Sequence, residues 1–196
     1  MKKSLLLQSA LALALASPLM ASAESQLVIG AGNASAQLDL RVVIPRVLFL
    51  GVGSGAALPL ANNASINALT FDYTTNPLDV GAGPTALAAS ITNDGPSPAG
   101  NAIPVRVFGN DGQITITATN PVNLTSGTDS IPFTELTVAT SNGALPAPGF
   151  SGGTSQPTMV GRVTNQTANW QYAYANTTTP AFGNYSGRVT YTATMP

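Results

Sequence analysis

The sequence predicts a single all-β domain of the sandwich or barrel type, and three observations lead to that prediction. Glycine and proline, 19 and 15 residues of the 196, interrupt the chain at the short intervals typical of β-sandwiches and barrels. The segments between them alternate apolar and polar residues, which is the period of a half-buried strand. β-branched Thr and Val recur in these segments, and none carries a helical pattern of useful length.

The start of the chain has the pattern of a secretory signal peptide. The positive residues 1–3 precede an apolar run of Leu and Ala over residues 4–20, and Ala21–Ala23 forms an A-x-A cleavage pattern. We therefore expect residues 1–23 to be removed and the protein to be exported. The apolar run is too short to favour a retained membrane anchor.

Two alternating segments follow, separated by Pro45. Residues 46–53 form a strongly apolar expected strand. Residues 34–44 have one polar face and one apolar face, and the apolar face consists of Ala34, Ala36, Leu38, Leu40, Val42 and Ile44. This strict alternation predicts a strand with one buried side.

The remaining strands are expected at 66–73, 85–92, 131–140, 159–164, 169–175 and 183–196. A hairpin is expected over 103–119, because Asn110 and Asp111 before Gly112 tolerate the left-handed conformations that hairpin turns need. The segments 93–101 and 143–157 are rich in Pro, Gly and Ser, and we expect both to be exposed connections within one domain.

The composition excludes several classes of function. Seven Lys and Arg residues stand against eight Asp and Glu residues without a basic cluster, which argues against nucleic acid and anionic membranes as partners. Histidine and cysteine are both absent, so the common nucleophile–base pairs and the usual zinc sites cannot be built. We therefore expect no enzymatic activity, no cofactor and no metal site.

Three weaker signals have simpler explanations. Asp72 and Asp79 could act as a carboxylate pair, but aspartate is common in turns, and turns are the favoured interpretation. The stretch GVGSG at 51–55 lacks the Lys-Ser/Thr of a phosphate loop and predicts a turn. Three further aspartates lie near glycine without the spacing of a calcium loop, and these are Asp94, Asp111 and Asp129.

Three aromatic residues alternate along one expected strand: Trp170, Tyr172 and Tyr174. A row of this kind can form a platform on which a sugar ring stacks. It is more often the inward face of a sandwich, and we favour that interpretation.

The end of the chain carries a more specific pattern. After Gly183, every second residue belongs to one face of an expected strand: Tyr185, Gly187, Val189, Tyr191, Ala193 and Met195. A glycine followed by an alternating terminal strand resembles the end of bacterial chaperone–usher pilus (fimbrial) subunits, and "AFGNYSGRV" is similar to the ends of the cysteine-free CFA/I-like (CS1-type) major pilins. In that family the periplasmic chaperone recognises this strand. The resemblance implies that role for Gly183, Tyr185, Val189, Tyr191 and Met195.

The beginning of the chain resembles the same family. There an alternating donor strand follows the signal peptide, and a proline then precedes the first strand of the domain; here "ASAQLDLRVVI" precedes Pro45. The resemblance implies an immunoglobulin-like β-sandwich over 46–196 that lacks its last strand. The extension 24–45 of a neighbouring subunit would complete it by inserting Leu38, Leu40, Val42 and Ile44.

The family also implies partners and a location. Subunits of this kind form a homopolymer or join related subunits, pass the chaperone in the periplasm and the usher in the outer membrane, and end in an extracellular fimbria that supports adhesion. The alternative is that residues 34–44 pair within their own chain, because alternation alone does not say which chain a strand completes. The protein would then be a secreted monomeric binding module for carbohydrate or surface adhesion.

Overall fold

The computed structural model describes residues 25–84, 90–92, 101–120, 122–150 and 152–196. The chain divides into two compact units, Met1–Ile44 and Pro45–Pro196. All described strands lie in the second unit, and the described part of the first unit, 25–44, contains neither helix nor strand. The expected signal peptide lies outside the described residues.

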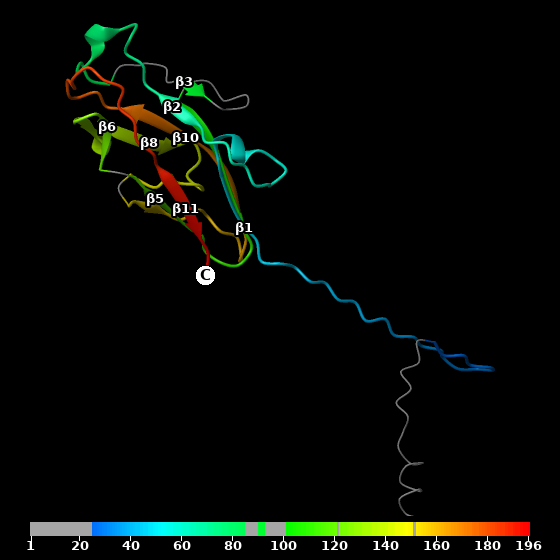
Figure 1. Ribbon diagram of the computed structural model, residues 1–196. Helices are drawn as coiled ribbons and strands as arrows, with labels where there is room; N and C mark the ends of the chain where they lie inside the picture. Colours follow the sequence, from blue (N-terminus) through cyan, green and yellow to red (C-terminus); the bar gives the residue numbers. More distant parts are fainter. Residues whose placement is uncertain (1–24, 85–89, 93–100, 121, 151) are drawn as a thin grey trace, which may run out of the picture. The chain divides into compact units, whose positions relative to one another are not determined.

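The second unit is built from antiparallel strands, and no α-helix occurs within the described ranges. One sheet has four strands in the order β1 (Leu48–Val52), β4 (Ala102–Gly109), β10 (Thr164–Tyr174) and β8 (Leu136–Thr140). A second sheet has three, in the order β11 (Thr190–Thr194), β5 (Thr115–Thr119) and β9 (Thr154–Ser155). Figure 1 shows β11 and β5 running beside the four-stranded sheet. The all-β prediction is confirmed.

Two small sheets and three 3-10 turns complete the unit. The small sheets pair β2 (Ala68–Thr70) with β3 (Ser90–Thr92), and β6 (Asn123–Ser126) with β7 (Asp129–Pro132). The 3-10 turns are η1 (Gly53–Ala56), η2 (Pro77–Asp79) and η3 (Phe133–Glu135). At Gly53 the backbone has a φ of +69°, a conformation that glycine adopts without strain. The turn predicted at 51–55 therefore begins at Gly53, whereas Gly51 and Val52 still belong to β1.

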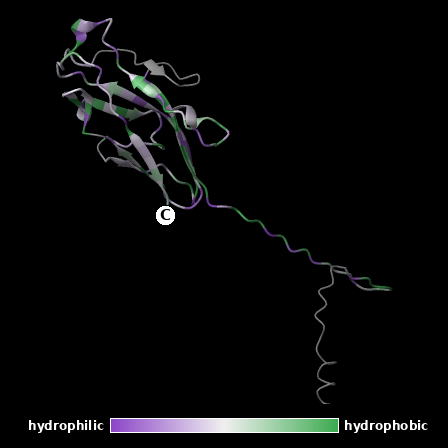
Figure 2. Ribbon diagram, in the orientation of Figure 1, coloured by the Kyte–Doolittle hydropathy of each residue, from purple (hydrophilic) through white to green (hydrophobic). Residues whose placement is uncertain are grey.

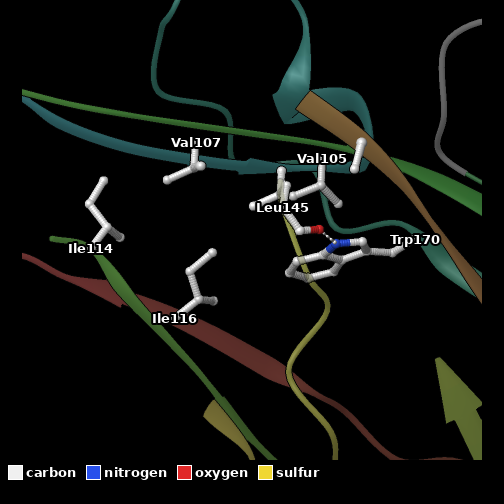
Figure 3. Close-up of a cluster of buried hydrophobic side chains, with 7 residues drawn as sticks. Val105, Val107, Ile114, Ile116, Leu145 and Trp170 are labelled. Carbon is white, nitrogen blue, oxygen red and sulfur yellow. Dashed lines mark hydrogen bonds between the residues drawn. The ribbon is translucent and has the colours of Figure 1, made fainter. Parts of the chain in front are cut away.

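The two larger sheets share one core, because alternate residues of β4 and of the β5 segment point toward each other (Figure 3). Val105 and Val107 of β4 face Ile114 and Ile116, and all four are at most 1% exposed. Trp170 of β10 is fully buried beside them, and its indole Nε1–H donates to the carbonyl of Leu145 at 3.3 Å. Burial of these side chains is the main favourable term in the stability of the unit.

The expected hairpin over 103–119 is wrong. β4 pairs with β1 and β10, whereas β5 pairs with β11 and β9, so the two strands belong to different sheets. The turn itself is where the sequence places it, with Gly112 at a φ of +101°. A turn signal predicts that the chain reverses, but strands can also change sheet at such a corner.

The expected exposed connection at 143–157 is also wrong. Leu145 is fully buried in the core, and Pro148 and Pro157 are buried as well. The segment even contributes β9 to the three-stranded sheet. Pro and Gly indicate the absence of regular structure, but they do not indicate exposure, and the single Leu among them was the signal of burial.

The other strand predictions hold in position and differ in length. The segment 46–53 contains β1, 66–73 contains β2, 131–140 contains the last two residues of β7 and all of β8, and 169–175 overlaps the second half of β10. At 159–164 the chain makes a bridge between Val160 and Val163, and the strand begins only at Thr164. Residues 85–89 and 93–100 of two further predictions lie outside the described residues.

Candidate functional site

Two strands that border the core, β1 and β11, have one hydrogen-bonded neighbour each among the described residues. β1 pairs with β4, and β11 pairs with β5. The two strands approach within 8 Å between Cα atoms, yet no ladder of hydrogen bonds joins them in the described chain. We call the region between them the seam, and its apolar side chains are Leu50, Val52, Tyr191, Ala193 and Met195.

The seam side chains pack on the core but remain half-buried. Leu48, at the start of β1, is 40% exposed. Half-covered apolar side chains between two strand edges with unused N–H and C=O groups are the features that let an additional strand bind. The seam therefore combines half-buried apolar side chains with two strand edges that no described strand pairs with.

An open cleft of ≈ 480 Å³ runs along the free edge of β1. All five residues of β1 line it, and the far wall is made by Gly55 and by loop residues from 61 to 65. No residue of β11 lines this cleft, so it adjoins only the β1 border of the seam.

The two strands that border the seam run in opposite directions. The start of β1 lies near the end of β11. Leu48 at the start of β1 pairs with Gly109, and Gly109 lies close to Met195, since a Cβ added to this glycine would be 3.1 Å from the Met195 sulfur. At the other end, Tyr191 near the start of β11 packs against the Trp170 ring at 4.9 Å between centroids. An inserted strand would thus run parallel to one border and antiparallel to the other.

Arg46 closes the seam at the end where β1 begins. Its Nη2 donates to the Met195 carbonyl at 3.0 Å, and its Nε lies 3.4 Å from the Asp111 carboxylate. Arg162 pairs with the same carboxylate. These side chains are largely exposed, and exposed ion pairs contribute only about 0–1 kcal/mol, so this group orders the end of the seam more than it stabilises the fold.

A tyrosine pair lies at the other end of the seam. The hydroxyls of Tyr172 and Tyr191 are 2.9 Å apart. Burial raises the pKa of Tyr172 well above its usual value, and the neighbouring Tyr191 adds to that effect. Burial also raises the pKa of Tyr191, partly offset by the hydrogen bond from Tyr172. Both rings therefore stay neutral at physiological pH and belong to the packed interior.

The structure brings part of the expected C-terminal strand to the seam. Tyr191 and Met195 border it, and the half-buried Val189 directly precedes β11. Gly183 and Tyr185 lie elsewhere: Gly183 approaches Ser126 of β6, and the tyrosine hydroxyl donates to the Ala181 carbonyl at 2.8 Å.

The expected strand over 183–196 is interrupted because its partner changes. Ser186 forms an isolated bridge with Thr125 of β6, with both backbone bonds at 3.0 Å. From Thr190 onward the chain pairs with β5 instead. Gly187 lies between the two pairings, where a Cβ would come within 2.7 Å of Leu124 and 3.0 Å of the Phe133 ring, so a larger residue would require these side chains to move.

The expected donor residues are exposed in the first unit. Leu38, Leu40, Val42 and Ile44 have 82%, 86%, 84% and 76% of their surface exposed. Figure 2 shows the alternation of apolar and polar residues along this segment. Residues 34–44 form no strand and pair with none of the described strands, so the strand expected there is not formed by the single chain.

The aromatic row is part of the interior, as favoured, and is not an exposed platform for a sugar. Trp170 is 0% exposed, and Tyr172 is half-buried against the core. Tyr174 packs on Phe71 and Tyr73, each at 6.0 Å between ring centroids. A sugar ring could reach the face of Trp170 only if the core opened.

The weaker sequence signals also have structural roles. The Asp72 carboxylate accepts the N–H of Thr74 at 2.8 Å, which lowers the pKa of Asp72, and the Asp79 carbonyl accepts from the buried Asn176 side chain. Both aspartates are therefore turn residues. Within the described ranges, no three His, Cys, Asp or Glu side chains gather as ligands for a metal ion, and no helix has the length and apolarity needed to cross a membrane.

Sequence reasoning identified β11 as a border of this site but missed the other border. β1 was expected only as an ordinary strand of the domain. The available signal was that the stretch around Leu50 is apolar on both faces, which is unusual for a strand at the edge of a sheet. Arg46 carried no sequence signal, because its role depends on the distant residues Asp111 and Met195.

The comparisons with known proteins place the chain in no family. No protein-family model matches it, and no curated protein is similar to it at a significant level.

Proposed function

We propose that this protein is an exported structural subunit that polymerises by strand exchange into an extracellular fimbria. In this proposal the second unit is an immunoglobulin-like sandwich that lacks one strand. Residues 34–44 of a neighbouring copy fill its seam, and contacts of this head-to-tail kind extend into a fibre because they do not close on themselves. The periplasmic chaperone and the outer-membrane usher would be its partners during export.

One observation carries the proposal: β1 and β11 lie close together without pairing to each other in the described chain, and residues 34–44 expose one apolar face. The seam offers half-buried apolar side chains between two strand edges. The segment offers four exposed aliphatic side chains on one face. Covering those four is worth roughly 6–12 kcal/mol before the cost of ordering the segment. The resemblance of both chain ends to chaperone–usher subunits supports the same conclusion.

The seam must widen to receive a strand. Paired strands lie about 4.7–4.9 Å apart, so a strand between two coplanar borders separates them by roughly twice that distance. β1 and β11 approach within 8 Å at their closest Cα atoms. We therefore expect β1 and β11 to move apart at those points when the donor binds.

The decisive experiment compares the chain from residue 24 with the same chain lacking 34–44, by size-exclusion chromatography and electron microscopy. We expect heat-stable multimers and fibres from the longer chain and none from the shorter one. A longer chain that stays monomeric, together with a shorter chain of the same stability, would contradict the proposal and favour a monomeric binding module.

Two neighbouring substitutions provide a matched control for this experiment. Leu40→Asp places a carboxylate on the apolar face of the segment, and we expect it to abolish the multimers. Arg41→Asp introduces the same group one residue later, on the polar face, and should leave the multimers in place. Equal effects would show that the segment acts through charge or flexibility and not through an inserted apolar face.

A further inference from the structure

The seam has two possible occupants, residues 34–44 of a neighbouring copy or the same residues of its own chain. Three residues, Pro45, Arg46 and Val47, connect Ile44 to Leu48, the first residue of β1. A tight reversal at these positions would lay residues 34–44 against the free edge of β1 as a hairpin. The conformation of residues 45–47 therefore decides which occupant is possible.

The Asn110 side chain bonds to the backbone of the residues on both sides of Arg46. Its Nδ2 donates to the Pro45 carbonyl at 2.8 Å, and its Oδ1 accepts the N–H of Val47 at 2.8 Å. The backbone N–H of Asn110 donates to the Val47 carbonyl at 3.3 Å. Residues two apart in an extended strand direct their backbone groups to the same side. The Pro45 carbonyl and the Val47 N–H both face Asn110, as they would in a strand.

The bonds between Asn110 and Val47 extend the contact between β1 and β4 by one residue before Leu48. β1 and β4 pair from Leu48 with Gly109, and Asn110 directly follows that glycine. A reversal at 45–47 would rotate the Pro45 carbonyl and the Val47 N–H away from the asparagine and break both side-chain bonds. Arg46 adds a second obstacle, because its contact with the Met195 carbonyl crosses the end of the seam through which the chain's own segment would enter.

We infer that Asn110 is a positioning residue that disfavours a chain reversal at residues 45–47, so that the seam takes residues 34–44 from a second copy and not from its own chain. This inference rests on the proposed function. It adds that the choice between self-completion and polymerisation is made by a polar clamp at the β4–β5 turn.

The chain offers a matched control in Asn142. This asparagine also makes one donor bond, from Nδ2 to the Thr167 carbonyl at 2.9 Å, and one acceptor bond, from the N–H of Ala144 at 3.0 Å. It is half-buried, as Asn110 is, but it touches neither residues 45–47 nor the seam side chains in these bonds. Asn142→Ala therefore removes the same kind of interactions without releasing the clamp.

The chain has no cysteine, so an introduced pair reports which copy fills the seam. Leu40→Cys combined with Ala193→Cys places one thiol on the apolar face of the segment and one on β11. A second pair, Val42→Cys with Ala193→Cys, covers a register two residues away. After oxidation, insertion into a neighbour gives a ladder on a non-reducing gel, whereas self-completion gives a cross-linked monomer.

We expect a ladder from the otherwise unchanged chain and from Asn142→Ala. Asn110→Ala should shift the ratio of cross-linked monomer to ladder by about tenfold, since two hydrogen bonds are lost. Asn110→Asp keeps the acceptor for the Val47 N–H but sets a carboxylate oxygen against the Pro45 carbonyl oxygen, so a shift in the same direction and at least as large is expected. This second variant also serves if Asn110→Ala fails to fold.

A positive control replaces the exit residues with a hairpin turn, Pro45→Asn with Arg46→Gly. This variant should give mainly cross-linked monomer. A ladder of unchanged strength from both Asn110→Ala and Asn110→Asp would overturn the inference while leaving the proposed function intact. The absence of cross-links and of heat-stable multimers in every background, including the unchanged chain, would overturn the proposed function itself.

Discussion

The centre of the second unit and its seam are built from similar residues but differ in how completely they are covered. In the centre, Val107 and Ile116 are fully buried. At the seam, Val52 and Ala193 pack on the same core yet stay half exposed. The centre has paired strands on both sides, whereas each border of the seam has one paired neighbour among the described residues. The difference shows that the amount of burial is decided by the number of neighbouring strands and not by residue type.

Trp170 tests the centre and should give the largest effect. Trp170→Ala removes a fully buried ring and the hydrogen bond to the Leu145 carbonyl, so we expect a loss of about 3–5 kcal/mol in the free energy of unfolding. Denaturant titration measures this loss. Phe182→Ala is the control, because that ring is fully exposed, and a change beyond about 0.5 kcal/mol there would be unexpected. A small loss for Trp170→Ala would mean that the centre is not the main source of stability.

Ala193 tests the seam and should affect assembly more than folding. Ala193→Asp places a carboxylate among half-buried apolar side chains, which we expect to cost about 1–3 kcal/mol of stability and to abolish the heat-stable multimers. Thr192→Asp makes the same change on the exposed face of β11, and should spare both properties. Multimers that survive Ala193→Asp in a chromatographic assay would remove the seam from the assembly site.

The tyrosine pair tests the border between the two regions through pH. The pKa of Tyr172 is raised in the folded protein because burial disfavours the phenolate, so the unfolded chain loses its protons first as pH increases. The resulting stabilisation is fully present below the ordinary tyrosine pKa, and it is lost as pH rises from there through the folded value.

We therefore expect the melting temperature to fall steeply above about pH 10. The double change Tyr172→Phe with Tyr191→Phe should flatten that fall, since neither ring then ionises. An identical alkaline decline in the double variant would assign it to other groups.

Asp111 tests the polar end of the seam and should give the smallest effect. Asp111→Asn removes both ion pairs, to Arg46 and Arg162, but the exposed side chains limit the loss to less than about 1 kcal/mol. Unfolding in low and high salt measures the change, which should shrink as salt screens the charges. A loss of about 2 kcal/mol or more would show that the ion pairs hold the end of the seam as firmly as buried contacts.

The sequence predicted the positions of β1 and β8, the second half of β10 and the location of β11 within a longer segment, because alternation and β-branched content are local properties. It did not predict that β4 and β5 separate into different sheets, since a turn signal carries no information about which strands become neighbours. The burial of Leu145 was not predicted, because it depends on contact with Trp170, which is 25 residues away, and the residues next to Leu145 give no sign of it.

The candidate site divides in the same way. Alternation predicted one apolar face in residues 34–44 and in the terminal strand that contains Tyr191 and Met195, and the resemblance to chaperone–usher subunits suggested that the two belong to one site. Gly183 and Tyr185 were expected beside them, but the structure places the glycine against Ser126. The roles of Arg46 and Asn110 required the tertiary structure, because each acts through a partner more than 60 residues along the chain.

By itself the sequence determined that this protein is all-β, that its chemistry excludes the common catalytic and zinc sites, and that one N-terminal segment has a single apolar face. These are consequences of composition and of the two-residue period of a strand. Only the tertiary structure decided that β1 and β11 approach each other without pairing in the described chain, and that the Asn110 side chain bonds to the backbone of residues 45 and 47. Those features depend on which strands pair, and pairing is chosen by the packing of side chains that are distant in the sequence.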